Sequence, residues 1–237
     1  MNTTIMGLTA RALLGRRRVL MLLPMPLVLI GLTLLGVYSG VDAADWGPPV
    51  FATLGLSVIL PLTALIVGSS VLGLEIDDGT ITHLLTKPLP RSEIVLSKLF
   101  VAWTVTTVAT AVPLAIGALI AGSSALAIGL VVGAAVGSLA YTALFLALSL
   151  LTKRPVAVGL VYIMLWENLL VNFVSGARVF SVQQHATAIA DAIADSPMLS
   201  SSVSLTTSVV VAIVFIIAGT VGATAKLRSF ALTGEAN

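Results

Sequence analysis

Six long runs of apolar residues constrain this chain more than any other feature of its sequence. A helix needs about 20 mostly apolar residues to cross the hydrocarbon core of a bilayer. The runs of that length cover residues 19–38, 50–74, 99–121, 125–151, 156–174 and 203–225. They lack the alternation of apolar and polar residues that is typical of barrel strands, so we predict six transmembrane helices. The predicted fold class is an all-α integral membrane protein, with one transmembrane domain over residues 1–237.

The composition excludes most classes of soluble protein. Hydrophobic residues make up 58% of the chain and charged residues only 9%, whereas a soluble domain carries about 25% charged residues. The net charge of +2 is too small to suggest a nucleic-acid partner. The chain has no cysteine, which excludes disulfides, thiolate catalysis and cysteine metal sites.

The basic residues predict the orientation of the spans. All but one of the 12 Lys and Arg residues lie before span one, between spans two and three, between spans four and five, or after span six. Arg178 is the exception. The positive-inside rule therefore places both termini in the cytoplasm. A cleaved signal peptide is the less favoured interpretation of the N-terminus, because the run 19–38 exceeds the roughly 7–15 apolar residues of a signal peptide.

The N-terminal segment, residues 1–18, is basic and weakly amphipathic. Ile5, Leu8 and Leu13 oppose Thr9 and Arg11. Such a segment either lies along the inner leaflet or simply anchors the first span, and the sequence favours neither.

The segment between spans two and three, residues 75–98, is rich in charge. It contains Glu75, Asp77, Asp78, Lys87, Arg91, Glu93 and Lys98. An aspartate can cap a short helix through Leu85, which Pro88 must end. This helix would carry apolar side chains without a core of its own. The residues alone support a membrane surface and a protein partner equally well.

The segment between spans five and six, residues 175–202, predicts a second short helix, on the outer side. Val182, Ala186, Ile189 and Ile193 recur at helical spacing, and Ser181 begins a capping box. We expect an amphipathic helix resting on the outer surface of the bundle, as a connector rather than a lid. His185 is then expected in solvent, in preference to a weak metal or proton site with Asp191 and Asp195.

Two features within the spans involve small or polar residues. Gly129, Gly133 and Gly137 share one face of span four and predict close helix packing, within the bundle or across a dimer. Span five contains Glu167, followed by Asn168 and Asn172. Burying a carboxylate in lipid costs at least ~2.5 kcal/mol, so Glu167 must face protein or water. It either lines a substrate path or bonds to a neighbouring helix; the polar strip slightly favours the path.

Motifs for catalysis are missing from the sequence. There is no nucleotide-binding P-loop, no zinc-protease motif and no hydrolase nucleophile motif. We therefore predict no catalytic, cofactor-binding or metal-binding residues in this chain, and no enzymatic activity of its own.

The run from Gly73 to Lys98 resembles the signature of type-2 ABC exporter permeases. In that family a glutamate after the second span precedes Gly-Thr-Ile, Leu-Leu, a proline, an arginine and a lysine. The matching residues here are Glu75, Gly79, Thr80, Ile81, Leu84, Leu85, Pro88, Arg91 and Lys98. Asp77 and Asp78 make this segment more acidic than in many relatives.

This resemblance implies a function and a set of partners. Two permease chains, identical or paralogous, would enclose a path through the cell membrane. The excess of Arg over Lys, 8 to 4, points to a bacterial source. Each permease chain would dock on one of two cytoplasmic ABC ATPase subunits, which bind ATP and Mg²⁺, through a coupling helix around Asp77 to Leu85. Two other functions remain open. One is an ATP-independent secondary transporter or channel, and the other is a non-transporting membrane anchor or immunity component.

Overall fold

The computed structural model describes residues 3–13, 15, 24–77, 90–173 and 175–233, and in this part of the chain it contains helices and no strand. The helices are α1 (Thr3–Leu13), α3 (Pro24–Tyr38), α4 (Ala43–Pro48), η1 (Pro49–Ile59), α5 (Leu60–Asp77), α7 (Arg91–Ile120), α8 (Ser124–Leu151), α9 (Pro155–Val161), η2 (Tyr162–Leu170), α10 (Val171–Phe173), η3 (Ser175–Phe180), α11 (Val182–Ala194) and α12 (Leu205–Thr233). Helices η1 and η2 are π-helical, and η3 is a 3₁₀ helix.

Four helical stretches in this part of the chain are long and apolar enough to cross a membrane. They are Ala43–Gly73, Arg91–Ile120, Ser124–Leu151 and Leu205–Ser229, which match predicted spans two, three, four and six to within a few residues at their ends, apart from the earlier starts described below. The helices of spans one and five, Pro24–Tyr38 and Pro155–Leu170, have only 10–17 residues. The all-helical class and an integral membrane protein are confirmed, whereas six spans with both termini inside stay a prediction.

Two of the long helices begin earlier than the hydropathy of the sequence indicates. The second begins at Ala43 rather than Val50, because the Asp42 side chain accepts a hydrogen bond from the Ala44 N–H at 3.1 Å and caps it. Pro48 lies at the end of α4, and Pro49 is the first residue of the π-helical stretch η1 that continues the helix. The third begins at Arg91 rather than Leu99, directly after Pro90. Both helices therefore extend past their apolar runs.

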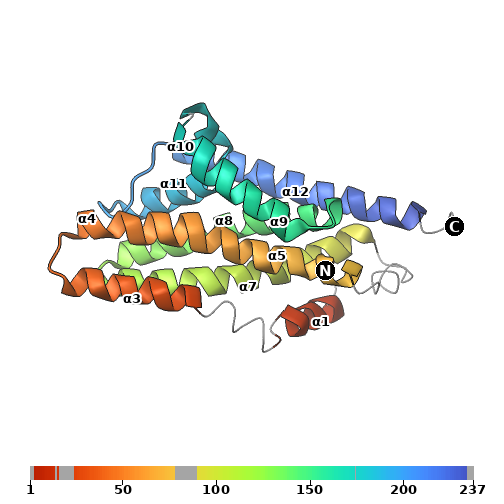
Figure 1. Cartoon of the computed structure of the whole chain (residues 1–237), viewed down its shortest axis with the longest axis horizontal. Coiled ribbons are helices and arrows are strands. Elements are labelled where there is room, and N and C mark those ends of the chain that lie inside the picture. Colours follow the sequence, from red (N-terminus) through yellow and green to blue (C-terminus); the bar gives the residue numbers. More distant parts are fainter. Residues whose placement is uncertain (1–2, 14, 16–23, 78–89, 174, 234–237) are drawn as a thin grey trace.

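Helix α8 lies at the centre of the bundle and contacts α5, α7, α11 and α12. Its side chains Tyr141 and Phe145 are fully buried and stack with ring centroids 5.8 Å apart. Helix α3 packs on α7 and η1, and its Leu29 is completely buried. Figure 1 shows the long helices side by side, with the α3–α4 turn at one end and the C-terminus at the other.

Helix α1 packs against α7 and α5 through Ile5, Thr9 and Leu13, which lie one turn apart and are buried. The prediction of which residues form its apolar face was therefore wrong in part. Leu8, expected on that face, is 61% exposed, whereas Thr9, expected opposite it, is buried. The helix thus uses a narrow stripe of every fourth residue to contact the bundle.

Candidate functional site

Buried Lys98 connects the helices on both sides of the charged segment 75–98. Lys98 is 1% exposed, and its Nζ donates a hydrogen bond to the Val71 carbonyl oxygen of α5 at 3.0 Å. Around it, Val67, Val71 and Leu72 of α5 pack with Ile94 and Leu99 of α7 in one buried cluster. The two helices therefore meet as a single packed unit where the charged segment leaves and re-enters the bundle.

The predicted coupling residues fall at the edges of the described part of this segment. Glu75 and Asp77 lie in the last turn of α5, and Arg91 is the first residue of α7. The others, Asp78, Gly79, Thr80, Ile81, Leu84, Leu85 and Pro88, lie outside the described residues, as does the short helix predicted through Leu85.

The glycines of span four face α11 within the same chain. A Cβ built on Gly133 would lie 2.5 Å from the Ala186 carbonyl oxygen and 2.8 Å from the Ala190 Cβ. A Cβ on Gly129 would meet Ala190 and Ala194, and one on Gly137 would meet Leu60 and Ala186. Only glycine lets the two helices approach so closely.

The order of these contacts gives the direction of α11. Gly129, near the start of α8, meets the end of α11, whereas Gly137, in the middle of α8, meets its beginning. Helix α11 therefore runs antiparallel to α8, from the middle of the bundle to one end. The predicted helix, its Ser181 cap and the burial of Val182, Ala186 and Ile189 are confirmed, whereas Ile193 is 40% exposed. The position on the outer surface was wrong, because α11 packs along α8 inside the bundle.

Glu167 lies where α11 begins, and its carboxyl group joins two helices. Oε1 accepts hydrogen bonds from the Tyr162 hydroxyl and the Val182 N–H, each at 3.0 Å. Oε2 accepts a hydrogen bond from the Ser181 hydroxyl. Ser181 is the N-cap of α11, and its oxygen also accepts from the Gln184 N–H at 3.2 Å. The carboxyl group thus satisfies donors at the first turn of α11, which lies deep in the bundle.

The other polar residues that the sequence places in span five are Asn168 and Asn172. Asn168 Nδ2 donates to the Ile163 carbonyl oxygen at 2.9 Å, five residues earlier, within the π-helical η2. The side chain of Asn172 lies outside the described part. Glu167 is only 3% exposed and bonds to its own chain. This geometry favours a bond to a neighbouring helix, the alternative to a substrate path.

His185 is buried, contrary to the expectation that it lies in solvent. It is 1% exposed; its Nδ1 lies 3.2 Å from the Ser208 Oγ of α12, and its Nε2 lies 2.8 Å from the Val179 carbonyl oxygen of η3. A signal was present in the sequence. His185 follows Val182 by three residues and precedes Ile189 by four, which places it on the apolar stripe.

The described residues contain no group of three His, Cys, Asp or Glu side chains placed to hold a metal ion. Taken together, the long apolar helices around α8 define an integral membrane protein. A family model described as ABC-2 family transporter protein matches residues 15–174, more than half of the chain. The chain belongs to this family and is a membrane subunit of an ABC transporter. A search of the curated proteins found no match.

Proposed function

We propose that this chain is the permease subunit of an ABC exporter in a bacterial cell membrane. It crosses the membrane six times, with both termini in the cytoplasm. Two such chains, identical or paralogous, enclose the substrate path. Each is driven by one of two cytoplasmic ATPase subunits, which bind ATP and Mg²⁺ and dock on the segment from Glu75 to Arg91.

The observation that carries this proposal is the packed unit formed by α5 and α7 around Lys98. Helix α7 runs from Arg91 to Ile120 in 30 residues, about 45 Å at 1.5 Å per residue. That exceeds the ~30 Å of the hydrocarbon core. A helix of this length, held to α5 at the charged end, transmits a displacement at that end to the opposite side of the membrane. Coupling between distant sites requires such a stiff element with two positions.

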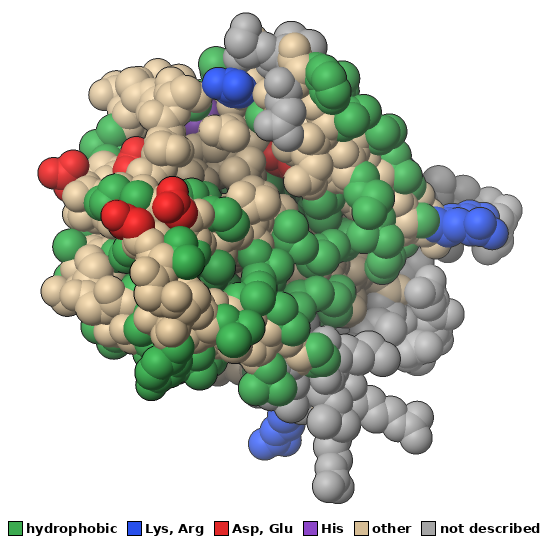
Figure 2. All heavy atoms as spheres, turned by 60° about the vertical axis from the view of Figure 1, so that its left-hand side comes forward, with side chains coloured by type: hydrophobic (Ala, Val, Ile, Leu, Met, Phe, Trp, Pro, Cys, Tyr) green, Lys and Arg blue, Asp and Glu red, His purple; other side chains and the backbone are tan. Residues whose placement is uncertain are grey.

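The distribution of charge supports the proposed orientation. Asp42 and Asp45 at the α3–α4 turn, and Asp191 and Asp195 at the end of α11, lie at one end of the bundle. Figure 2 shows acidic side chains gathered on the face of the molecule at that end. Lys153 and Arg154, in the link between α8 and α9, lie at the other end. The end with the basic residues faces the cytoplasm by the positive-inside rule.

A secondary transporter or channel is the weaker candidate. Such proteins use ionisable side chains that face a water-filled path. The buried ionisable side chains described above, Lys98, Glu167 and His185, all bond to groups of this chain instead. A non-transporting membrane component would share the same fold, and reconstituted transport separates it from a permease.

The first test of this proposal is co-purification with the cognate ATPase. The chain alone should hydrolyse no ATP, whereas co-expression with the ABC ATPase should yield a stable complex with ATPase activity. ATP hydrolysis by the chain alone would overturn the assignment of the ATPase to a separate subunit. So would the failure of every candidate ATPase to bind.

The second test separates coupling from folding. Glu75→Ala and Arg91→Ala should reduce transport and substrate-stimulated ATP hydrolysis several-fold while membrane expression stays near the wild-type level. Arg228→Ala, which removes an exposed cation from α12 at the same end, is the matched control. Wild-type transport by both variants in an intact complex would exclude this segment as the coupling element.

A further inference from the structure

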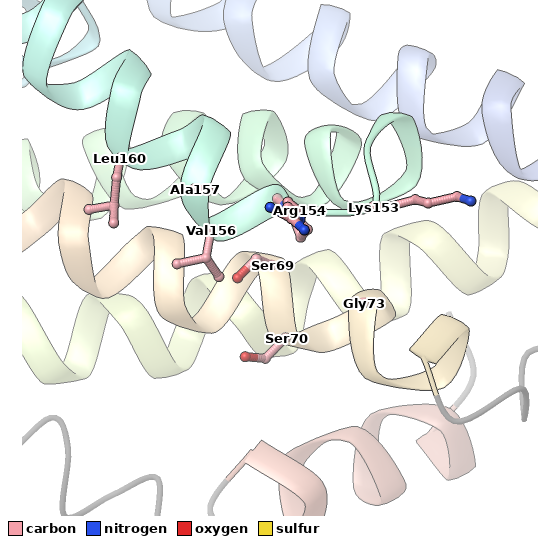
Figure 3. Close-up of a pocket in the computed structure, with 9 residues that line it drawn as sticks. Ser69, Ser70, Gly73, Lys153, Arg154, Val156, Ala157 and Leu160 are labelled. Atoms are coloured by element: carbon pink, nitrogen blue, oxygen red, sulfur yellow. The ribbon is translucent and has the colours of Figure 1, made fainter.

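A cavity of about 490 Å³ opens between α5 and α9 at the end of the bundle that carries the basic residues. Its α5 wall consists of Ser69, Ser70 and Gly73. Its other wall consists of Lys153, Arg154, Pro155, Val156, Ala157 and Leu160. Figure 3 shows the two walls facing each other, with the Val156 side chain directed toward α5.

The packing of α5 and α9 explains why the cavity exists. A Cβ on Gly159 would collide with the Leu65 side chain, so the two helices touch there. Toward the basic end the contact opens, and a Cβ on Gly73 would meet no atom within 4 Å. The cavity is therefore closed at its deep end and open toward the membrane–water boundary.

The cations at the mouth of this cavity have no acidic partner among the described residues. The Lys153 and Arg154 side chains are exposed. Arg154 forms its hydrogen bonds through its backbone: its N–H donates to the Thr152 Oγ1 at 3.2 Å, and its carbonyl oxygen accepts from the Val158 N–H at 3.1 Å. A second cavity, of about 480 Å³, adjoins the same two residues on the other side, against Val158 and Val161. Both cations are thus available to an anion from two sides.

The walls below the cations present no further donor for an anion. The Ser69 and Ser70 hydroxyls donate to carbonyl oxygens of their own helix, at Leu65 and Ile66, each at 2.6 Å. The opposite wall is apolar as far as Leu160, five residues after Pro155 and therefore roughly 8 Å deeper. A ligand that fits must combine an anionic head with an apolar tail.

We propose that this cavity binds an anionic phospholipid, with its phosphate at Lys153 and Arg154 and the start of an acyl chain along Val156 and Leu160. Arginine and lysine are the side chains that bind phosphate, and basic pockets between transmembrane helices on the cytoplasmic side bind phosphate headgroups. The volume lies within the ~300–1,000 Å³ range of small-molecule sites. The inference goes beyond the proposed function, because lipid binding requires neither transport nor an ATPase.

The test measures lipid retained by the purified full-length chain in detergent, by native mass spectrometry. Phosphatidylglycerol should bind and phosphatidylcholine should not. The double variant Lys153→Gln/Arg154→Gln should lose roughly 10- to 30-fold in affinity for phosphatidylglycerol, as expected for two cations at a lipid headgroup. Arg11→Gln/Arg228→Gln removes the same charge from the same end, outside the cavity, and should bind normally.

A steric variant keeps the proposal falsifiable if the double variant does not fold. Gly73→Leu fills the cavity from an open position, retains both cations and should also abolish retention of phosphatidylglycerol. Equal binding of the two lipids, an equal loss in the control pair, or normal binding by Gly73→Leu would overturn the proposal. Displacement of the lipid by equimolar glycerol 3-phosphate would assign the site to a soluble phosphate. If the Lys153→Gln/Arg154→Gln variant bound lipid normally but lost the ATPase from the complex, Lys153 and Arg154 would be assigned to the protein partner instead.

Discussion

At the scale of single residues, the carboxyl group of Glu167 does what a helix N-cap usually does, but from another helix. The first N–H groups of a helix have no partner within it. At α11 these groups lie deep in the bundle, where water does not reach them. Glu167 supplies an acceptor to the Val182 N–H and orients the capping hydroxyl of Ser181. One side chain therefore fixes where the chain turns after η2.

We predict that Glu167→Gln is tolerated and Glu167→Ala is not. Glutamine keeps one acceptor for Tyr162 and Val182, and its amide can donate to the Ser181 oxygen. Alanine leaves buried donors unpaired, at about 1–3 kcal/mol each. Thermal unfolding in detergent should show a small decrease in Tm for glutamine and a loss of several degrees or more for alanine.

The opposite result would restore the substrate-path interpretation of Glu167. If both variants unfold like the wild type but Glu167→Gln changes substrate-stimulated ATP hydrolysis, the charge acts on the substrate. Tyr162→Phe is a useful control, because it removes one of the three donors and keeps the ring.

The sequence identifies these residues better than it identifies their roles. Glu167 is conspicuous as an acidic residue within an apolar run, but only the fold shows that Ser181, fourteen positions later, lies against it. His185 was misplaced because the expectation rested on its polarity rather than on its position in the apolar stripe. Its bonds to Ser208 and Val179 depend on contacts between elements. Such contacts leave no periodic pattern in the sequence.

At the scale of helices, the close contact between α8 and α11 depends on glycines, which have no side chain, along one face of α8. Gly129 and Gly133 let the α11 backbone approach α8. The sequence predicts this face correctly as a packing surface, but leaves open whether the partner is in the same chain. A hydropathy profile cannot answer that question, because α11, with 13 residues, is too short to be identified as a transmembrane helix.

We predict that Gly133→Ala destabilises the protein by about 1–3 kcal/mol, the usual cost of overpacking a core. The added methyl group would lie 2.5 Å from a backbone carbonyl oxygen, so α11 must move. Gly222→Ala in α12 is the matched control, since its Cβ would meet nothing within 4 Å. It should be neutral or slightly stabilising, because alanine favours helix by about 1 kcal/mol over glycine. Equal unfolding temperatures for the two variants would contradict close packing of α8 on α11.

The boundaries of the helices show a second limit of the sequence. Apolar runs locate the hydrocarbon core, and caps and prolines set where a helix begins. Asp42 and Pro90 each start a helix well before the corresponding apolar run. The π-helical turns of η1 and η2 have no counterpart in the hydropathy pattern, because they consist of backbone hydrogen bonds between residues five apart, such as that from the Leu60 N–H to the Gly55 carbonyl oxygen.

At the scale of the whole molecule, the topology depends on the two short helices. Pro24–Tyr38 has 15 residues, roughly 22 Å at 1.5 Å per residue, and Pro155–Leu170 is extended by only the three residues of α10. The hydrocarbon core is ~30 Å thick, and a short span is accommodated by local thinning of the bilayer or by its flanking residues. The basic residues predict that both helices cross. If either did not, the segments that carry Lys and Arg would no longer all lie on the same side of the membrane.

The absence of cysteine makes this topology directly testable. Single cysteines at Ser39, Ser124 and Ser200 should react with a membrane-impermeant maleimide in intact cells, because these exposed residues flank the spans on the outer side. Cysteines at Thr152 and Ser229 should react only after the membrane is opened. Ser39 tests the first short helix, and the pair Thr152 and Ser200 tests the second. If Ser39 reacted only after lysis, Pro24–Tyr38 would not cross. If Thr152 and Ser200 reacted from the same side, Pro155–Leu170 would be a re-entrant helix, and a six-span permease would be excluded.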